Sequence, residues 1–292
     1  MNMSNALSGL KQTVKSFVHR ARRTYFKTFR RFDANDFRIA LEATGLRPGA
    51  RVMVHSSVDR FIGFAGTPLD ALRVIQSVVG ESGTIMMPTM PFTGLASDYA
   101  KSETFNVRRS PSQMGILTEL LRRMPATVRS IHPTHPVAVW GKNAEEIAAG
   151  HPAAKTPCGS GSPFHELLTR GGSILLIDVD IQAMTFFHTL EELYEDKLPH
   201  SPFTTEVFQL ASIDRNGTRI PTETRLFDSR VARIRVLRRL IPPLRSMGAW
   251  REARVGGVRL VLLDCESIRL AYLGLCDSGV HCYDFARLDA AR

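Results

Sequence analysis

The chain alternates short apolar runs with stretches whose apolar residues recur at helical spacing, and this alternation constrains its fold most strongly. Apolar runs occupy residues 51–55, 84–88 and 173–180, and each follows a turn that contains glycine. Helical periodicity separates these runs, most clearly over residues 68–79. Strands that alternate with helices are typical of the α/β class, so we predict an α/β fold.

The pattern changes after Pro199, where strands no longer alternate with helices. Residues 205–213 and 218–227 predict a β-hairpin that turns at Asn216 and Gly217, so we expect the central β-sheet to be mixed and flanked by helices. The remaining predictions are a helix over 231–240 that ends before Pro242 and Pro243, a strand over 254–265, and a last helix over 267–274. Residues 89–112 predict a long surface excursion, either a binding loop or a spacer.

The positive charge of the chain is concentrated at its start. The formal net charge is +10, which favours nucleic acid, a membrane surface or a phosphorylated small molecule as partner. Residues 1–32 carry eight lysines and arginines and no acidic residue, with apolar residues at helical spacing. We predict a basic amphipathic arm over 1–32 and an enzyme domain over 33–292. The arm either lies on an anionic membrane or docks on the domain or another subunit. Without aromatic RNA-binding motifs, nucleic acid is not expected.

Cysteine usage and hydropathy predict a cytoplasmic protein, with peripheral contact at the inner face of the membrane as an option for the arm. The four cysteines form no CxxC pair, which indicates reduced thiols instead of a disulfide framework. No segment reaches the roughly 18 consecutive apolar residues of a membrane span, and the N-terminus lacks the apolar run of a signal peptide.

The strongest candidate for chemistry is the segment 184–196, which directly follows the buried strand 173–180. On a helix, Thr185, His188 and Glu191 fall near one face, and Glu192 lies four residues after His188. A histidine beside a carboxylate at the carboxyl end of a strand is suited to act as a general base with an orienting partner. The alternative is a helix whose histidine packs in the core and whose glutamates face water.

Two loops supply further candidates. His55, Ser56 and Ser57 follow a strand and precede Gly63 and Gly66, so hydroxyls and backbone N–H groups there suit phosphate or carbonyl oxygens. This loop lacks the P-loop signature, and the alternative is a purely structural turn.

The second loop contains His132 and His135, stiffened by Pro133 and Pro136. We expect one of these histidines to line a pocket or to hydrogen-bond the loop. We expect no metal, because zinc requires three or four ligands.

Taken together, these stretches resemble the aminoglycoside 3-N-acetyltransferases, a family of acetyl-CoA-dependent enzymes distinct from the GNAT fold. The matching stretches occur in the family's order over about residues 46–192: VMVHSSVDRFIGFAGTPLDALRVI, GTIMMPT, MGILTELLRRMPATVRSIHPTHPVAVWG, HPAAKTPCGSGSPFHELL and LLIDVDIQAMTFFHTLEE. The resemblance implies an α/β fold with a mixed sheet. It also implies acetyl-CoA or another acyl-CoA as co-substrate, and direct acyl transfer to an amino group without an acyl-enzyme.

The resemblance also assigns roles to individual residues. It implies that His188 is the general base and that Glu191 orients it. It implies that the His55–Ser56–Ser57 loop, with Gly63 and Gly66, accommodates the pantetheine arm and phosphates of CoA. We further expect Ser57 or Thr185 to polarise the thioester carbonyl. We expect Arg129, or a neighbouring basic residue, to meet the CoA phosphates, and we place Ser130 at the same cofactor site.

The acceptor is the open part of this prediction. We place His132, His135, Asp178 and Glu192 at the acceptor site. The chain departs from the family there: Pro136 replaces a hydroxyl residue and Asp178 a glycine.

The basic composition favours an amino sugar of surface-polysaccharide biosynthesis, phosphate- or lipid-linked, as acceptor. The alternatives are an aminoglycoside resistance enzyme and a non-catalytic scaffold that binds membrane or nucleic acid. The oligomeric state is left open, with a homo-oligomer among the options.

Overall fold

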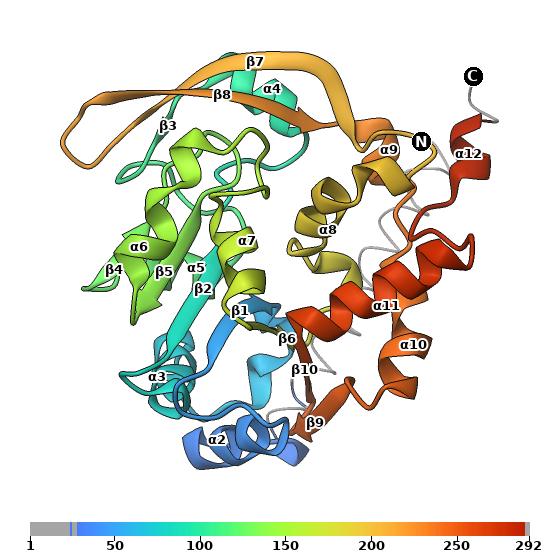
Figure 1. The fold of residues 1–292 in the computed structure, drawn as a ribbon. Coiled ribbons are helices and arrows are strands. Elements are labelled where there is room, and N and C mark those ends of the chain that lie inside the picture. The colour runs from blue at the N-terminus through green and yellow to red at the C-terminus, as the bar shows by residue number, and fades with distance from the viewer. Residues whose placement is uncertain (1–23, 25–27, 290–292) are drawn as a thin grey trace, which may run out of the picture.

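The centre of the molecule is a seven-stranded mixed sheet with the strand order β4-β5-β2-β1-β6-β10-β9 (Figure 1). The structure is a computed structural model, and it describes residue 24 and residues 28–289. Its strands are β1 (Arg51–Ser56), β2 (Thr84–Pro88), β4 (Thr127–Arg129), β5 (Val137–Gly141), β6 (Ser173–Ile177), β9 (Arg251–Val255) and β10 (Val258–Asp264). The three middle strands are parallel, and the outer strands pair antiparallel. The predicted α/β class and mixed sheet are confirmed.

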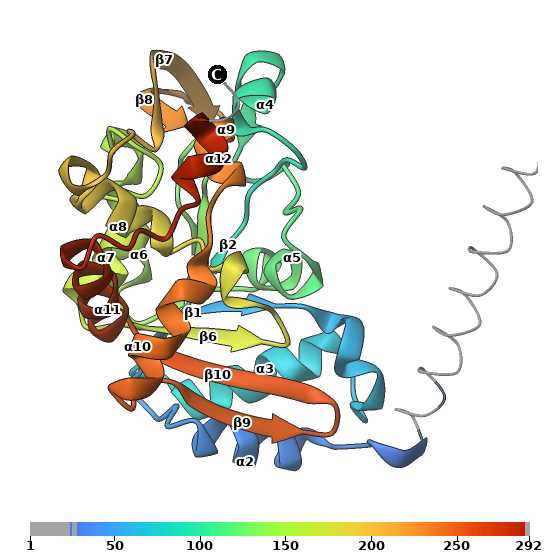
Figure 2. The same cartoon turned by 90° about the vertical axis from the view of Figure 1, so that its right-hand side faces the viewer.

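Helices cover both faces of this sheet because its strands are apolar on both sides. Val52 and Val54 face one hydrophobic cluster, whereas Met53 faces the other. The first face is covered by α2 (Ala34–Ala43), α3 (Pro68–Val79) and α5 (Ile116–Arg123). The second is covered by α6 (Ala144–Ala149), α7 (Pro163–Thr169), α8 (Phe187–Leu193) and α11 (Cys265–Asp277). Figure 2 shows the resulting layers with α2 beneath β9.

The predicted hairpin is confirmed as β7 (Phe203–Ile213) and β8 (Arg219–Phe227), which pair antiparallel. It does not join the central sheet, so the expectation that it makes that sheet mixed is wrong. Instead it forms a separate three-stranded sheet with β3 (Phe105–Asn106), at the top of Figure 1. The predicted excursion 89–112 contributes β3 and the short helix α4 (Ala96–Ser102) to this part of the fold.

Several predictions for the last sixty residues need correction. The helix expected over 231–240 is instead α9 (Ser229–Arg233) and a 3₁₀ turn (Leu237–Leu240). Pro242 and Pro243 do not stop a helix but lie in the first turn of α10 (Ile241–Ser246). Backbone N–H groups in a first turn have no partner within the helix, so the missing N–H of proline costs no hydrogen bond there. The strand expected over 254–265 is the hairpin β9–β10, which turns at Gly256 with φ of +56°. The last predicted helix is longer, as α11, and α12 (Phe285–Asp289) follows it.

Phe32, the last residue of the predicted arm, is buried in the packed domain. Phe32 is 3% exposed and packs against Phe64 with ring centroids 5.3 Å apart. Residues 1–23 and 25–27 of the predicted arm lie outside the described residues. In the part of the chain that the structure describes, no helix is long and apolar enough to cross a bilayer.

Candidate active site

The candidate site forms at the carboxyl ends of β1 and β6, where the chain leads from β6 into α8. Helix α8 is shorter than the predicted segment 184–196, because 3₁₀ turns at Ile181–Ala183 and Glu195–Lys197 flank it. Thr185 precedes the helix, and its carbonyl accepts a hydrogen bond from the backbone N–H of His188 at 3.0 Å. This short helix brings His188 and Glu191 onto one face.

His188 and Glu191 form the expected pair. Nδ1 of His188 lies 2.5 Å from Oε2 of Glu191, and the side chains are 16% and 0% exposed. A carboxylate can only accept, so Nδ1 donates and the neutral ring presents Nε2 as its acceptor. The buried carboxylate therefore selects the tautomer that a general base needs.

Two residues that were not predicted from the sequence also donate hydrogen bonds to the Glu191 carboxylate. Nε and Nη2 of Arg235 donate to the two oxygens of Glu191 at 2.6 and 3.0 Å, and the Tyr283 hydroxyl donates to Oε1. Burial acts to raise the pKa of Glu191, but the charges and hydrogen bonds of Arg235 and His188 outweigh it and lower the pKa to about 2. Glu191 is therefore ionised at neutral pH.

Aromatic rings hold the imidazole of His188 in place. The Phe227 ring stacks on it with centroids 4.2 Å apart, and the His135 ring meets it edge-on at 6.1 Å. The Arg235 guanidinium lies over the Phe227 ring, 5.4 Å from its centroid. Burial, followed by the charge of Arg235, lowers the pKa of His188 below its ordinary value of 6.5. His188 is thus neutral at pH 7 and free to accept a proton.

A second histidine lies next to this site at the end of β1. His55 is 8% exposed, and its Nε2 has no hydrogen-bond partner among the described residues. Burial, with the charge of His188, lowers the pKa of His55 to about 4. An unpartnered buried nitrogen at a strand end fits contact with a polar group of a bound molecule.

In the loop that begins with His55, Ser56 and Ser57 lie near this site, whereas Gly63 and Gly66 pack elsewhere. Ser56 ends β1, and Ser57 donates its backbone N–H to the Ile177 carbonyl at 2.9 Å. The Gly63 carbonyl accepts from Phe32 N at 3.0 Å, and a Cβ at Gly66 would overlap the Phe64 ring. The two glycines thus help the loop to pack against Phe32 and Phe64, while the serines lie at the carboxyl end of β1.

The two loop histidines have different positions. Nδ1 of His132 accepts the backbone N–H groups of Thr134 and His135 at 3.2 and 3.1 Å, and its ring stacks on His151 at 4.6 Å. His132 is fully buried, whereas His135 reaches the ring of His188. His132 therefore shapes the loop that presents His135. Among the described residues, no cluster of His, Cys, Asp and Glu could hold a metal ion.

The environments of Arg129 and Ser130 give no support to contact with CoA phosphates. Arg129 is 3% exposed and donates to the carbonyls of Thr89, Val107 and Ser110 at 2.6, 3.3 and 2.5 Å. Its guanidinium also lies 4.7 Å from the Phe105 centroid. The Ser130 hydroxyl is likewise taken up, by His151 and Val137 N, both at 2.8 Å. Arg129 instead fastens the 89–112 segment to β4.

Replacing Arg129 with methionine is expected to lower the free energy of unfolding by at least about 2 kcal/mol, because two buried carbonyls and one partly buried carbonyl lose their donor. Acetyl-CoA affinity should stay unchanged in the folded variant. Denaturant unfolding and calorimetry measure the two effects. The exposed Arg219→Met serves as control, with an expected change within about 0.5 kcal/mol. A stable Arg129→Met protein with weakened acetyl-CoA binding would restore the CoA-phosphate role.

The two acidic residues assigned to the acceptor site lie at the ends of the surrounding elements. Asp178 follows β6 with φ of +53°, and its N–H donates to the Arg259 carbonyl at 2.8 Å. A left-handed backbone favours glycine, which the resemblance leads one to expect here. Glu192 accepts from the Thr156 hydroxyl, and a Cβ at Gly159 would overlap its carboxylate. Burial raises the pKa of Glu192 to about 7, although Arg225 acts to lower it.

Glu192 is expected to make the unfolding free energy fall as the pH rises from about 4.5 to 7. Its folded pKa lies above its unfolded value, so in this range the folded state binds more protons than the unfolded state. In Glu192→Gln this fall should be smaller, as measured by urea unfolding at several pH values. Glu195→Gln is the control, because the pKa of Glu195 is lowered. An unchanged pH dependence in Glu192→Gln would contradict the assignment.

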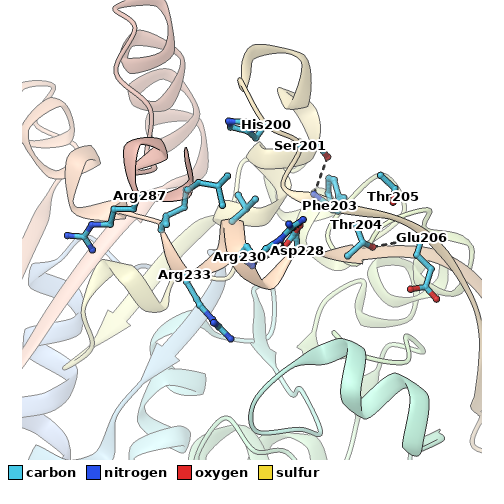
Figure 3. A pocket seen from close by; sticks show the side chains of 13 residues that line it. His200, Ser201, Phe203, Thr204, Thr205, Glu206, Asp228, Arg230, Arg233 and Arg287 are labelled. Carbon is cyan, nitrogen blue, oxygen red and sulfur yellow. Dashed lines mark hydrogen bonds and ion pairs between the residues drawn. The ribbon is translucent and has the colours of Figure 1, made fainter. Parts of the chain in front are cut away.

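A large cavity adjoins this aromatic stack. It holds about 660 Å³ between the start of β7, α9 and α12, and Phe203 in its wall stacks on Phe227 at 4.9 Å. Figure 3 shows that Arg233 and Arg287 in its lining extend in different directions. A smaller cavity of about 110 Å³ is lined by Thr185, His188 and Arg235 themselves. The two cavities therefore lie on either side of the segment 231–237, next to the candidate site.

A neutral histidine held by a buried carboxylate, at the carboxyl edge of a mixed α/β sheet, is the arrangement that general-base chemistry requires. The family model for aminoglycoside 3-N-acetyltransferase matches residues 53–271, and the chain belongs to this family.

Individual relatives match a shorter part of the chain. Aminoglycoside N(3)-acetyltransferase VII of Streptomyces paromomycinus is 32% identical over 167 residues, which are 52% of this chain and 58% of that protein. The SPbeta prophage-derived aminoglycoside N(3′)-acetyltransferase-like protein YokD of Bacillus subtilis (strain 168) is 30% identical over 168 residues, 52% of this chain and 61% of that protein. The chain therefore matches less than two thirds of the length of these curated relatives.

Solved structures share the fold over nearly the whole chain. Aminoglycoside acetyltransferase AAC(3)-Xa superposes with a TM-score of 0.74 at 24% identity, covering 90% of this chain and 99% of its own. AAC-IIIb in a binary complex with CoASH superposes with a TM-score of 0.70 at 21% identity, covering 86% and 98%. The architecture beyond the matched half of the sequence is therefore that of the same fold.

Proposed function

We propose that this protein is a CoA-dependent N-acyltransferase that moves an acetyl group from acetyl-CoA to an amino group of an amino-sugar acceptor. The observation that carries the proposal is the His188–Glu191 pair, in which a buried carboxylate leaves Nε2 of a neutral imidazole as a proton acceptor. Family membership supports the reaction class.

In the proposed reaction, His188 Nε2 takes a proton from the acceptor amine as the amine nitrogen attacks the thioester carbonyl carbon. A C–N bond forms and the C–S bond breaks, so the acetyl group passes directly to the acceptor. The imidazolium then returns its proton to the leaving thiolate, which departs as CoASH. Glu191 stabilises the imidazolium and Arg235 keeps Glu191 ionised, while the Ser57 or Thr185 hydroxyl would donate to the carbonyl oxygen.

Acetyl-CoA, or another acyl-CoA, is the proposed donor. Support comes from the family and from a structural neighbour whose title describes a complex with CoASH. In this chain, His55 Nε2, Ser56 and Ser57 at the end of β1 would contact the pantetheine arm next to His188. The reaction requires no metal, because the base and the oxyanion donors are side chains.

Membership of the same family supports an amino sugar as the acceptor. Aminoglycosides are the first acceptors to test, because the relatives carry that name and one structural neighbour is described in complex with a gentamicin. The second candidate is a phosphate- or lipid-linked amino sugar of surface-polysaccharide biosynthesis, which the net charge of +10 favours. His135, whose ring touches His188, would border either acceptor.

A free-thiol assay with acetyl-CoA tests the proposal and separates the acceptors. Gentamicin, glucosamine and glucosamine 1-phosphate are supplied in turn, each with a control that lacks protein. Acceptor-dependent thiol release above the control supports N-acyl transfer, and the acceptor with the highest kcat/KM identifies the class. Folded protein that binds neither CoA nor acetyl-CoA in calorimetry would reject the proposal in favour of a scaffold.

A further inference from the structure

A second large polar cavity lies at the opposite edge of the central sheet from His188. It holds about 650 Å³ and is bordered by the first residues of β1, β6 and β9 and the last residue of β10. The strand register sets Ser173 beside Val52 on one side and Asp264 on the other. His55 is at the far end of β1, so this cavity is separate from the candidate active site.

Three arginines from different segments line this cavity. Arg47 comes from the turn before β1, Arg51 begins β1, and Arg251 begins β9. Arg51 donates to the Arg170 carbonyl at 3.3 Å, and none of the three forms an ion pair with a described carboxylate. Asp264 provides the cavity's one carboxylate among its lining residues, and it caps α11 by accepting Ser267 N at 2.7 Å. Three positive charges thus face a single negative charge.

The rest of the lining leaves room for a ligand between these arginines. Gly171 and Gly248 form parts of the wall, and a Cβ at either position would meet open space. Ser173 and Ser267 add hydroxyl groups that make no hydrogen bond to other described residues. The cavity therefore offers unused donors of two kinds and an excess of positive charge.

We propose that this cavity, the arginine pocket (Arg47, Arg51, Ser173, Arg251 and Ser267), binds a soluble small molecule that carries a diphosphate or phosphate group. Guanidinium groups donate in pairs to phosphate oxygens, and hydroxyls complete such contacts. An anion would also relieve the repulsion between the arginines. This site is distinct from the one proposed for acyl transfer and does not depend on that function.

Calorimetry of the full chain with inorganic pyrophosphate tests the proposal. The double variant Arg47→Ala/Arg251→Ala is expected to bind at least about tenfold more weakly than wild type, because it loses two of three charged donors. The matched control Arg108→Ala/Arg109→Ala removes two exposed arginines outside the pocket and should bind like wild type. Unchanged melting temperatures show that both variants are folded.

Four results would overturn the proposal. Wild-type protein that does not bind pyrophosphate lacks the site, and equal losses in both double variants indicate a general charge effect. A matching loss of acetyl-CoA affinity in Arg47→Ala/Arg251→Ala would instead place the CoA diphosphate here. Loss of binding to vesicles containing phosphatidic acid, in that variant alone, would indicate a lipid surface and not a soluble ligand.

Discussion

Replacing His188 with alanine is expected to lower kcat for acyl transfer by about 10²–10⁴-fold, the usual contribution of a general base. The amine would then have to lose its proton to water while its nitrogen attacks the thioester. Acetyl-CoA affinity should change little, because the proposed contacts of the donor come from His55 and the serines that follow it. The free-thiol assay gives kcat, and calorimetry gives the affinity for acetyl-CoA.

The control for this variant is His165→Ala, which removes an imidazole from α7, away from the Glu191 pair. Its kcat should equal that of wild type. The wild-type rate should also fall on the acid side only below pH 6.5, because the pKa of His188 is lowered and protonation removes the base. Full turnover in folded His188→Ala would exclude this residue as the base.

Replacing Glu191 with alanine is expected to lower the free energy of unfolding by about 3–5 kcal/mol, in addition to reducing turnover. The change leaves the Arg235 guanidinium, whose side chain is 12% exposed, without its carboxylate, and it removes the acceptor of the Tyr283 hydroxyl. An unpaired charge in such surroundings is costly, so the loss should greatly exceed that of a surface pair. Urea unfolding at pH 7 measures it.

A surface ion pair provides the comparison for Glu191. Glu42→Ala breaks the pair with Arg38 on α2, whose side chains are 47% and 43% exposed, and should cost only about 0.3–0.5 kcal/mol. Glu191→Gln keeps the shape but weakens the bonds to Arg235, so its loss of stability should lie between these values. If Glu191→Ala were no less stable than Glu42→Ala, the carboxylate would not anchor the C-terminal segment.

Local patterns predicted the first two thirds of the fold better than the last third. The helix predicted over 68–79 has those bounds in the structure, because Thr67 caps it and a glycine follows it. The 231–240 segment was misassigned because its helical periodicity spans a break after Arg233. There the backbone of Val236 bonds to the Cys282 carbonyl, and a contact so distant in sequence leaves no local signal.

The same distinction applies to the candidate site. The spacing of His188 and Glu191 was visible because three residues separate them on one helix. Arg235 and Tyr283 lie 44 and 92 residues from Glu191, so only the folded chain brings them to its carboxylate. Arg129 shows the converse. Its place in a predicted loop suggested contact with a ligand, but in the folded chain its N–H groups donate to backbone carbonyls.

The most direct test of direct acyl transfer by this site is mass spectrometry of a single turnover. Protein, acetyl-CoA and gentamicin are mixed, and the masses of the acceptor and of the intact protein are measured. We expect one acetyl group on the acceptor and none on the protein. At a reaction time that completes one wild-type turnover, we expect no detectable acetylated acceptor with His188→Ala. Acetylated protein in the absence of acceptor, or acceptor acetylation at the wild-type rate in His188→Ala, would contradict direct transfer with His188 as the general base.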